Sequence, residues 1–131
     1  MKEKDVELHH SLKRYIFTKI PIVRRGQSLR AVFSMIKKES SALEMLDYIY
    51  VIDKRDRLVG ALSLKDLFSH SPDVPVERIM RTDLIKASSK TDAEKVAHMA
   101  LKSDLKAIPI VESGKIIGVI PSKKIVHILN K

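Results

Sequence analysis

The 131-residue chain contains no cysteine and no tryptophan, and only three tyrosines and three phenylalanines. Without cysteine it can form neither a disulfide framework, nor a thiol nucleophile, nor a Cys-ligated zinc site. Its apolar runs, such as Tyr48–Ile52, are far too short to cross a bilayer. Its first residues, Met1–Val6, lack the apolar segment of a signal peptide. These absences predict a cytoplasmic protein.

Positive charge is in excess. The chain has 25 Lys and Arg against 16 Asp and Glu, a formal net charge of +9. Such a surface can attract nucleic acid, an anionic membrane or an anionic small ligand. The cations are spread along the chain, and the densest clusters are Lys13-Arg14, Arg24-Arg25, Lys37-Lys38 and Lys123-Lys124. The few aromatic residues make a poor platform for base stacking, so we expect no nucleic acid partner. A basic nucleic-acid-binding accessory domain is nevertheless kept as one alternative for the function, besides those given below.

The chain nearly repeats itself. The segment Tyr48–Leu67 returns as Ala107–Ile125, and the upstream segment Gln27–Ile36 matches Thr91–Ala100. The duplication predicts two similar lobes packed about a pseudo-twofold axis, with a natural ligand site in the cleft between them. No residue with catalytic chemistry repeats with the unit, and no nucleotide-binding or metalloprotease motif occurs. We therefore expect a protein that is not an enzyme.

Hydrophobic periodicity predicts an α+β fold with the order β-α-β-β-α in each repeat. Ser28 is the expected N-cap of the first repeat's helix, and Thr91 with Glu94 forms an expected capping box in the second. Ser113-Gly114 predicts the turn of the second hairpin. The predicted boundaries are residues 1–19 for an N-terminal helix and lead-in segment, 20–70 for the first repeat, 71–82 for a linker and 83–131 for the second repeat.

The repeated pattern resembles the tandem CBS (cystathionine-β-synthase) domain pair. The resemblance rests on Gly60–Asp66, which has the pattern of a strand followed by a helix. It also rests on the strands that end in Asp53 and Glu112 and precede this pattern in the two repeats. The segments Tyr48–Asp53, Leu62–Leu67, Pro75–Met80 and Thr91–Ala97 are similar to the cytosolic CBS region of MgtE-type magnesium transporters. That likeness implies a regulatory module that forms a homodimer at the cytosolic face of the membrane, next to a transmembrane transporter domain, and responds to Mg²⁺ and/or an adenosine nucleotide.

The resemblance also implies a nucleotide site in the first repeat. A Ser and an Asp three residues later, here Ser63 and Asp66, line the ligand site of CBS pairs that bind adenosine compounds. Asp66 can accept hydrogen bonds from ribose hydroxyls, Ser63 can bind ribose or phosphate, and Lys65 can pair with phosphate. The side chains expected to hold the base are Ile20, Ile22 and Tyr50. An alternative is that Ser63 and Asp66 only cap a helix.

The second repeat has Pro121 where the first has Ser63, and Lys124 where the first has Asp66. A ribose finds no carboxylate there, so we expect one nucleotide site per chain. The candidate magnesium ligands are the acidic residues Asp53, Asp56, Asp73, Asp83, Asp92, Glu94 and Asp104. The region is basic, and the cations that flank Asp53 and Asp56 oppose a preformed Mg²⁺ site. A stand-alone sensor of AMP, ADP, ATP or S-adenosylmethionine that regulates a soluble partner is the second alternative.

Overall fold

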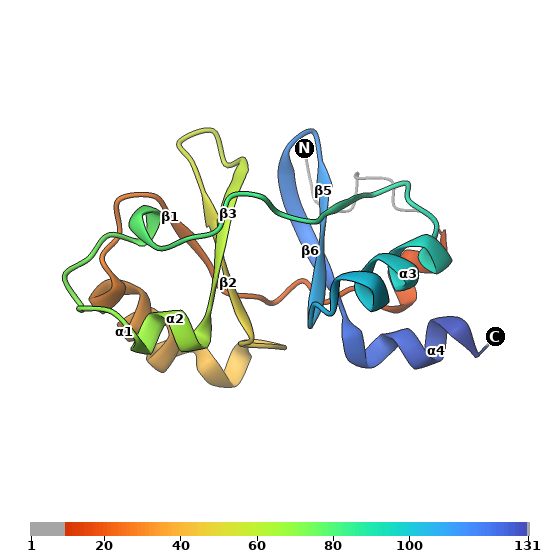
Figure 1. Ribbon diagram of the computed structural model, residues 1–131, viewed down its shortest axis with the longest axis horizontal. Helices are drawn as coiled ribbons and strands as arrows, with labels where there is room; N and C mark the ends of the chain where they lie inside the picture. Colours follow the sequence, from red (N-terminus) through yellow and green to blue (C-terminus); the bar gives the residue numbers. More distant parts are fainter. Residues whose placement is uncertain (1–9, 131) are drawn as a thin grey trace. The chain divides into compact units, whose positions relative to one another are not determined.

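The computed structural model describes residues 10–130 and divides the chain into two compact units (Figure 1). The repeat-1 unit contains residues 19–84. The repeat-2 unit contains residues 85–130 together with residues 10–18 from the N-terminal part of the chain. Each unit has a three-stranded sheet and helices, so the predicted α+β class is confirmed. None of the helices within residues 10–130 is long and apolar enough to span a bilayer.

The repeat-1 unit has the predicted order of elements. These are β1 (Ile22–Arg24), α1 (Leu29–Glu39), β2 (Tyr48–Ile52), β3 (Leu58–Ser63) and α2 (Leu64–Phe68), with short 3₁₀ turns at Ser40–Ala42 and Val76–Arg78. The sheet order is β1-β2-β3, in which β1 runs parallel to β2 and β2 runs antiparallel to β3. Figure 1 shows α1 and α2 side by side on the same side of this sheet.

Apolar periodicity explains the core of this unit. As predicted, the Ser28 side chain caps α1 by accepting the N–H of Ala31 at 3.1 Å. The helix then buries one stripe against one face of the sheet. The buried residues of this core are Val23, Leu29, Val32, Ile36, Ile49, Val51, Leu62, Leu67 and Val76. Val76 comes from the segment 71–82 that the sequence predicts as a linker, so this segment packs on the repeat-1 unit.

The repeat-2 unit has the same order. Its elements are β4 (Ala87–Ser88), α3 (Ala93–Ser103), β5 (Ala107–Glu112), β6 (Lys115–Pro121) and α4 (Ile125–Leu129), with 3₁₀ turns at His10–Arg14 and Ser122–Lys124. The sheet order is β4-β5-β6, again one parallel and one antiparallel pair. The β5–β6 hairpin turns at Ser113-Gly114, as predicted, with both residues at positive φ.

Each sheet gains one more contact from a lead-in segment, the stretch that precedes a repeat in the sequence. Phe17 pairs with Val119 in the repeat-2 unit, and Arg81 pairs with Ala61 in the repeat-1 unit. The segment before each repeat therefore packs on the unit formed by the other repeat. A side chain at Gly118 would lie 2.7 Å from the carbonyl oxygen of Phe17, so the close approach of this segment requires glycine.

Two local predictions need correction. The N-cap of α3 is Asp92, not Thr91, and the side chain of Asp92 makes no cap hydrogen bond. The Thr91 hydroxyl instead accepts the N–H of Ser88 at 3.0 Å, which closes the turn before the helix. The predicted N-terminal helix falls partly outside the described residues, and its described part is the 3₁₀ turn His10–Arg14.

Candidate functional site

Ser63 and Asp66 form a reciprocal capping box at the start of α2. The N–H of Asp66 donates to Ser63 Oγ at 3.1 Å, and the N–H of Ser63 donates to Asp66 Oδ2 at 3.0 Å. Both side chains are half-buried, whereas Lys65 between them is exposed. The cap uses one carboxylate oxygen of Asp66, which leaves Oδ1 to accept further hydrogen bonds. The arrangement therefore stabilises the helix and keeps acceptor capacity for a ligand.

Strand register places three of the predicted base-site and ribose-site residues on one face of the repeat-1 sheet. Ile22 lies opposite Tyr50, and Tyr48 lies opposite Ser63. Because side chains alternate along a strand, Ile22, Tyr50, Tyr48 and Ser63 all face away from the core that contains Ile49 and Val51. Ile20 comes just before β1 and is buried, while Ile22 is 38% exposed.

Tyr50 carries a polar group without a partner. The residue is only 2% exposed, and its hydroxyl has no hydrogen-bond partner among residues 10–130. Burial raises the pKa of this hydroxyl well above its ordinary value, and the neighbouring Tyr48 and Asp47 raise it further. Tyr50 therefore stays protonated at neutral pH and offers a hydrogen-bond donor. An unsatisfied buried donor costs about 1–3 kcal/mol, so a partner for it would be stabilising.

The equivalent position in repeat 2 cannot make the same contacts. Pro121 lies opposite Ala107, as Ser63 lies opposite Tyr48 in repeat 1, so the two positions are structurally equivalent. Pro121 has no side-chain hydroxyl and makes no cap hydrogen bond. Lys124 follows three residues later, where repeat 1 has Asp66. Repeat 1 thus has a hydroxyl at the first of these two positions and a carboxylate at the second, and repeat 2 has neither.

The candidate metal ligands do not assemble. Within residues 10–130 no group of three or more His, Cys, Asp or Glu side chains is placed to hold a metal ion. Asp53 Oδ1 instead accepts the N–H groups of Arg55 and Arg57 at 2.8 and 3.0 Å. The backbone N–H of Arg57 is the main cause that holds the pKa of Asp53 below its ordinary value. Asp56 pairs with Arg24 at 2.7 Å, and Asp73 with Arg30 at 3.0 Å. The described residues do not fit a preformed Mg²⁺ site.

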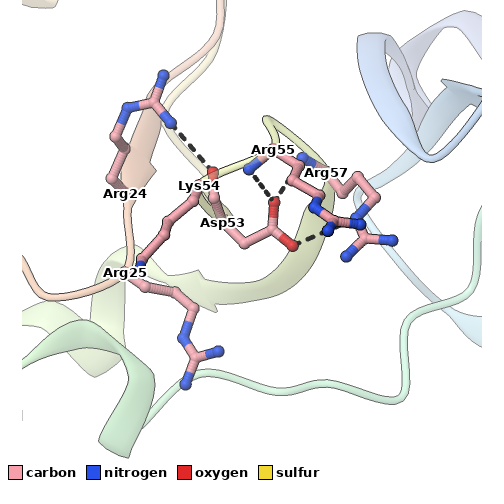
Figure 2. Close-up of a pocket in the computed structure, with 6 residues that line it drawn as sticks. All are labelled: Arg24, Arg25, Asp53, Lys54, Arg55 and Arg57. Carbon is pink, nitrogen blue, oxygen red and sulfur yellow. Dashed lines mark hydrogen bonds and ion pairs between the residues drawn. The ribbon is translucent and has the colours of Figure 1, made fainter.

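The structure also shows a pocket that the sequence analysis did not predict. It has a volume of about 360 Å³ and is lined by Arg24, Arg25, Asp53, Lys54, Arg55 and Arg57 (Figure 2). Two signals for it are present in the sequence, the Arg24-Arg25 cluster and the basic turn that follows Asp53. Only the parallel pairing of β1 with β2 brings them together.

Comparison with known proteins settles the family. The family model for the CBS domain matches the chain twice, over residues 12–73 and 76–131. The chain belongs to the CBS domain family. It is a tandem CBS module, as the sequence predicts.

The relatives include magnesium transporters. The magnesium transporter MgtE of Thermus thermophilus is 32% identical over 108 residues, which are 82% of this chain and 24% of that protein. The magnesium transporter MgtE of Bacillus subtilis is 33% identical over 95 residues, 72% of this chain and 21% of that protein. A crystal structure of the cytosolic domain of the Mg²⁺ channel MgtE in complex with ATP matches with a TM-score of 0.84 and 28% identity, covering 91% of this chain and 52% of that one.

These matches define how far the likeness extends. The chain spans 24% and 21% of the length of these two MgtE transporters. What it shares with them is the CBS pair, and the MgtE structure that it resembles is of a cytosolic domain.

Proposed function

We propose that this CBS pair is a regulatory, non-catalytic module of a magnesium transport system that binds an adenosine nucleotide in its first repeat and acts at the cytosolic face of the membrane. The observation that carries the proposal is the shared face of the repeat-1 sheet, where Ser63, Tyr50 and Ile22 lie together and Asp66 follows Ser63 at the sheet's edge. The likeness to an MgtE cytosolic domain whose crystal structure holds ATP supports this choice of ligand.

Each side chain has a distinct part in the proposed site. The free Oδ1 of Asp66 accepts hydrogen bonds from the ribose hydroxyls, and the Ser63 hydroxyl donates to a ribose or phosphate oxygen. The exposed ammonium of Lys65 pairs with phosphate. The apolar surfaces of Ile20, Ile22 and Tyr50 contact the base, and the unpartnered Tyr50 hydroxyl donates to a ligand acceptor.

Regulation requires that the ligand favours one conformation of the module. A nucleotide shifts the equilibrium between two conformations only by the difference between its affinities for them. A transmembrane domain linked to the module would respond to that shift. Because no three described carboxylates lie close enough together to hold a metal ion, we propose that Mg²⁺ reaches this module with the nucleotide's phosphates rather than in a site of its own.

A homodimer would suit this role, and exposed apolar groups on the helices offer a contact surface. Phe33 of α1 and Phe68 of α2 are 42% and 65% exposed and meet edge to face at 5.5 Å. Replacing both by Ser should shift a dimer to monomer in analytical ultracentrifugation. The control is Ile85→Ser, which removes an exposed apolar side chain outside these helices. An unchanged mass for the Phe33/Phe68 variant would contradict this dimer contact.

A thermal-shift panel tests the ligand. ATP, ADP, AMP and S-adenosylmethionine are compared with and without Mg²⁺, because a ligand at 100 times its Kd adds about 2.7 kcal/mol to the stability of the folded state. We expect a rise of several degrees in Tm with at least one adenosine compound. No rise with any of them would contradict the proposed ligand.

Two serine caps provide a matched pair of variants. Ser63→Ala and Ser28→Ala each remove an N-cap, at a cost of about 1 kcal/mol. Only Ser63→Ala should weaken nucleotide binding, because Ser28 lies outside the proposed site. Equal weakening by both variants would show that loss of stability, not loss of a ligand contact, is the cause.

A further inference from the structure

A strongly basic pocket lies at the end of the repeat-1 sheet where β2 turns into β3. Arg24 and Arg25 come from the end of β1, and Lys54, Arg55 and Arg57 come from the hairpin turn. Figure 2 shows Arg24, the last residue of β1, and Arg25, which follows it, on one side of Asp53, with Arg55 and Arg57 on the other. The backbone explains this convergence, because the N–H of Arg25 donates to the carbonyl of Ile52, one residue before Asp53.

The pocket's single carboxylate does not neutralise it. Five cationic side chains surround Asp53, a formal excess of four positive charges among the described lining residues. Asp53 is already occupied, because its Oδ1 accepts two backbone N–H groups and its Oδ2 accepts the Arg57 Nε–H at 3.3 Å. Asp53 therefore shapes the turn that presents the cations.

The cations of the pocket differ in whether they form ion pairs with acidic residues. Arg24 is held in place, since it donates to the carbonyl of Asp53 at 3.0 Å and pairs with Asp56 at 2.7 Å. Arg25, Lys54 and Arg55 are exposed, and none of them forms an ion pair with another described residue. Like charges gathered in one pocket repel one another, and an anion bound between them would relieve that repulsion.

This pocket lies at the opposite end of β3 from Ser63, the residue that begins the capping box with Asp66. Arg57 immediately precedes β3 and Ser63 ends it, so they are six positions apart along an extended chain. At about 3.3 Å per residue the separation is ~20 Å. The equivalent place in repeat 2 has different chemistry. Ser89 takes the position of Arg25, since its N–H donates to the carbonyl of Val111, and its hydroxyl donates to Glu112.

We infer that this pocket is a second ligand site, which binds a compact polyanion carrying two or more phosphate groups. Guanidinium groups match phosphate oxygens in a bidentate geometry, and four arginines line the site. A volume of about 360 Å³ suits a small ligand. None of the six described lining residues is aromatic, which disfavours a stacked base. The recognised group is the phosphate cluster, on a soluble molecule or on a lipid headgroup.

Isothermal titration calorimetry with inorganic tripolyphosphate tests the inference on the full chain. The test variant is Arg25→Gln with Arg55→Gln, because both side chains are exposed and lack an ion pair, so the fold should persist. The control is Lys37→Gln with Lys38→Gln, which removes the same charge from the end of α1 in the same unit. We expect the Kd to rise about tenfold or more in the test variant and less than about twofold in the control.

Three results would overturn the inference. They are an absence of tripolyphosphate binding to the wild-type chain, equal weakening by both double variants, and no weakening by the test variant. Equal weakening would mean that the general positive charge of the chain, not the pocket, attracts the anion. Asp66→Asn should leave tripolyphosphate binding unchanged, which separates this site from the nucleotide site.

Vesicle sedimentation distinguishes the two sources of phosphate. Phosphatidylcholine vesicles with and without cardiolipin, whose headgroup carries two phosphate groups, are mixed with the wild-type chain and both double variants. Binding that needs cardiolipin and is lost only in the Arg25/Arg55 variant assigns the site to a lipid headgroup. Tripolyphosphate binding without vesicle binding assigns it to a soluble ligand.

Discussion

The two repeats have the same order of elements but differ in chemistry at both ends of their sheets. At the end where the last strand enters a helix, repeat 1 has Ser63 and Asp66, and repeat 2 has Pro121 and Lys124. At the hairpin end, repeat 1 has a basic turn around Asp53, and repeat 2 has the tight Ser113-Gly114 turn. The apolar framework is thus duplicated, while the groups that we propose to bind ligands are concentrated in repeat 1.

The difference shows which residues the fold requires. Gly60 and Gly118 occupy equivalent positions, and both allow a lead-in segment to approach the last strand of the sheet. A position that keeps the same residue for a packing reason in both repeats serves the fold. Asp66 of repeat 1 corresponds to Lys124 of repeat 2, so the fold does not require a carboxylate at this position. Its residue can therefore serve a ligand in one repeat alone.

Asp66→Asn should produce the largest difference between the repeats. The amide keeps an oxygen that can accept the N–H of Ser63, but it loses the charge that strengthens hydrogen bonds to ribose. We expect nucleotide affinity to fall about ten- to hundredfold, because such a bond contributes roughly 1.5–3 kcal/mol. Lys124→Gln is the matched change in repeat 2 and should leave the affinity unchanged in the same titration. An unchanged Kd for Asp66→Asn would contradict the proposed site.

Gly118→Ala should destabilise the protein more than Gly60→Ala. The added methyl at Gly118 lies 2.7 Å from the backbone oxygen of Phe17, whereas at Gly60 the nearest atoms belong to the flexible side chain of Met80. We expect Gly118→Ala to lower the free energy of unfolding by about 1–3 kcal/mol in urea denaturation. Gly60→Ala should fall at or below the lower end of that range. The reverse order would contradict the account of the lead-in segments.

Tyr50→Phe should leave the unliganded protein as stable as before, or more stable by about 1 kcal/mol. It removes a buried hydroxyl that has no partner among the described residues. The same change should reduce the Tm increase caused by a bound nucleotide, because the proposed ligand contact is lost. Thermal denaturation with and without ATP measures both effects. A large loss of stability without ligand would show that the hydroxyl has a structural partner.

Asp53 should make a small contribution to the loss of folding stability at low pH. Its folded-state pKa lies below the ordinary value of 3.8, mainly because the Arg57 N–H donates to it. A depressed folded-state pKa means that unfolding takes up a proton, so this contribution is present above about pH 4 and is lost as the pH falls through the folded-state value. We expect the fall in Tm between pH 5 and pH 2 to be smaller in Asp53→Asn than in the wild type. Equal slopes would contradict the assignment.

Periodicity and turn residues predict most of the fold correctly. The alternation of apolar residues defines both hairpins, and Ser28 and Ser113-Gly114 act at the predicted cap and turn. The capping box at Thr91 is wrong because the hydroxyl of Thr91 accepts the N–H of Ser88 instead, a local competition that spacing alone does not reveal. Sequence periodicity also does not show that each lead-in segment packs on the other repeat's unit, because that pairing is long-range.

The candidate site could be predicted only in part. Ser63 and Asp66 are close in sequence, so their relation is readable without a structure. Two features of the site depend instead on strand register, namely the missing partner of the Tyr50 hydroxyl and the convergence of Arg24 and Arg25 with the hairpin cations. Register is set by pairing between distant segments, so residue types alone do not reveal these features.

The stoichiometry of ATP binding, measured by isothermal titration calorimetry in the presence of Mg²⁺, measures the difference between the repeats directly. The titration uses the Arg25→Gln, Arg55→Gln variant, so that the triphosphate does not also occupy the basic pocket. We expect one nucleotide per chain, because the hydroxyl and carboxylate occur in repeat 1 and not at the equivalent positions of repeat 2. Two equivalent sites per chain would contradict the claimed difference between the repeats, and an absence of heat for every adenosine compound would contradict a nucleotide-binding role.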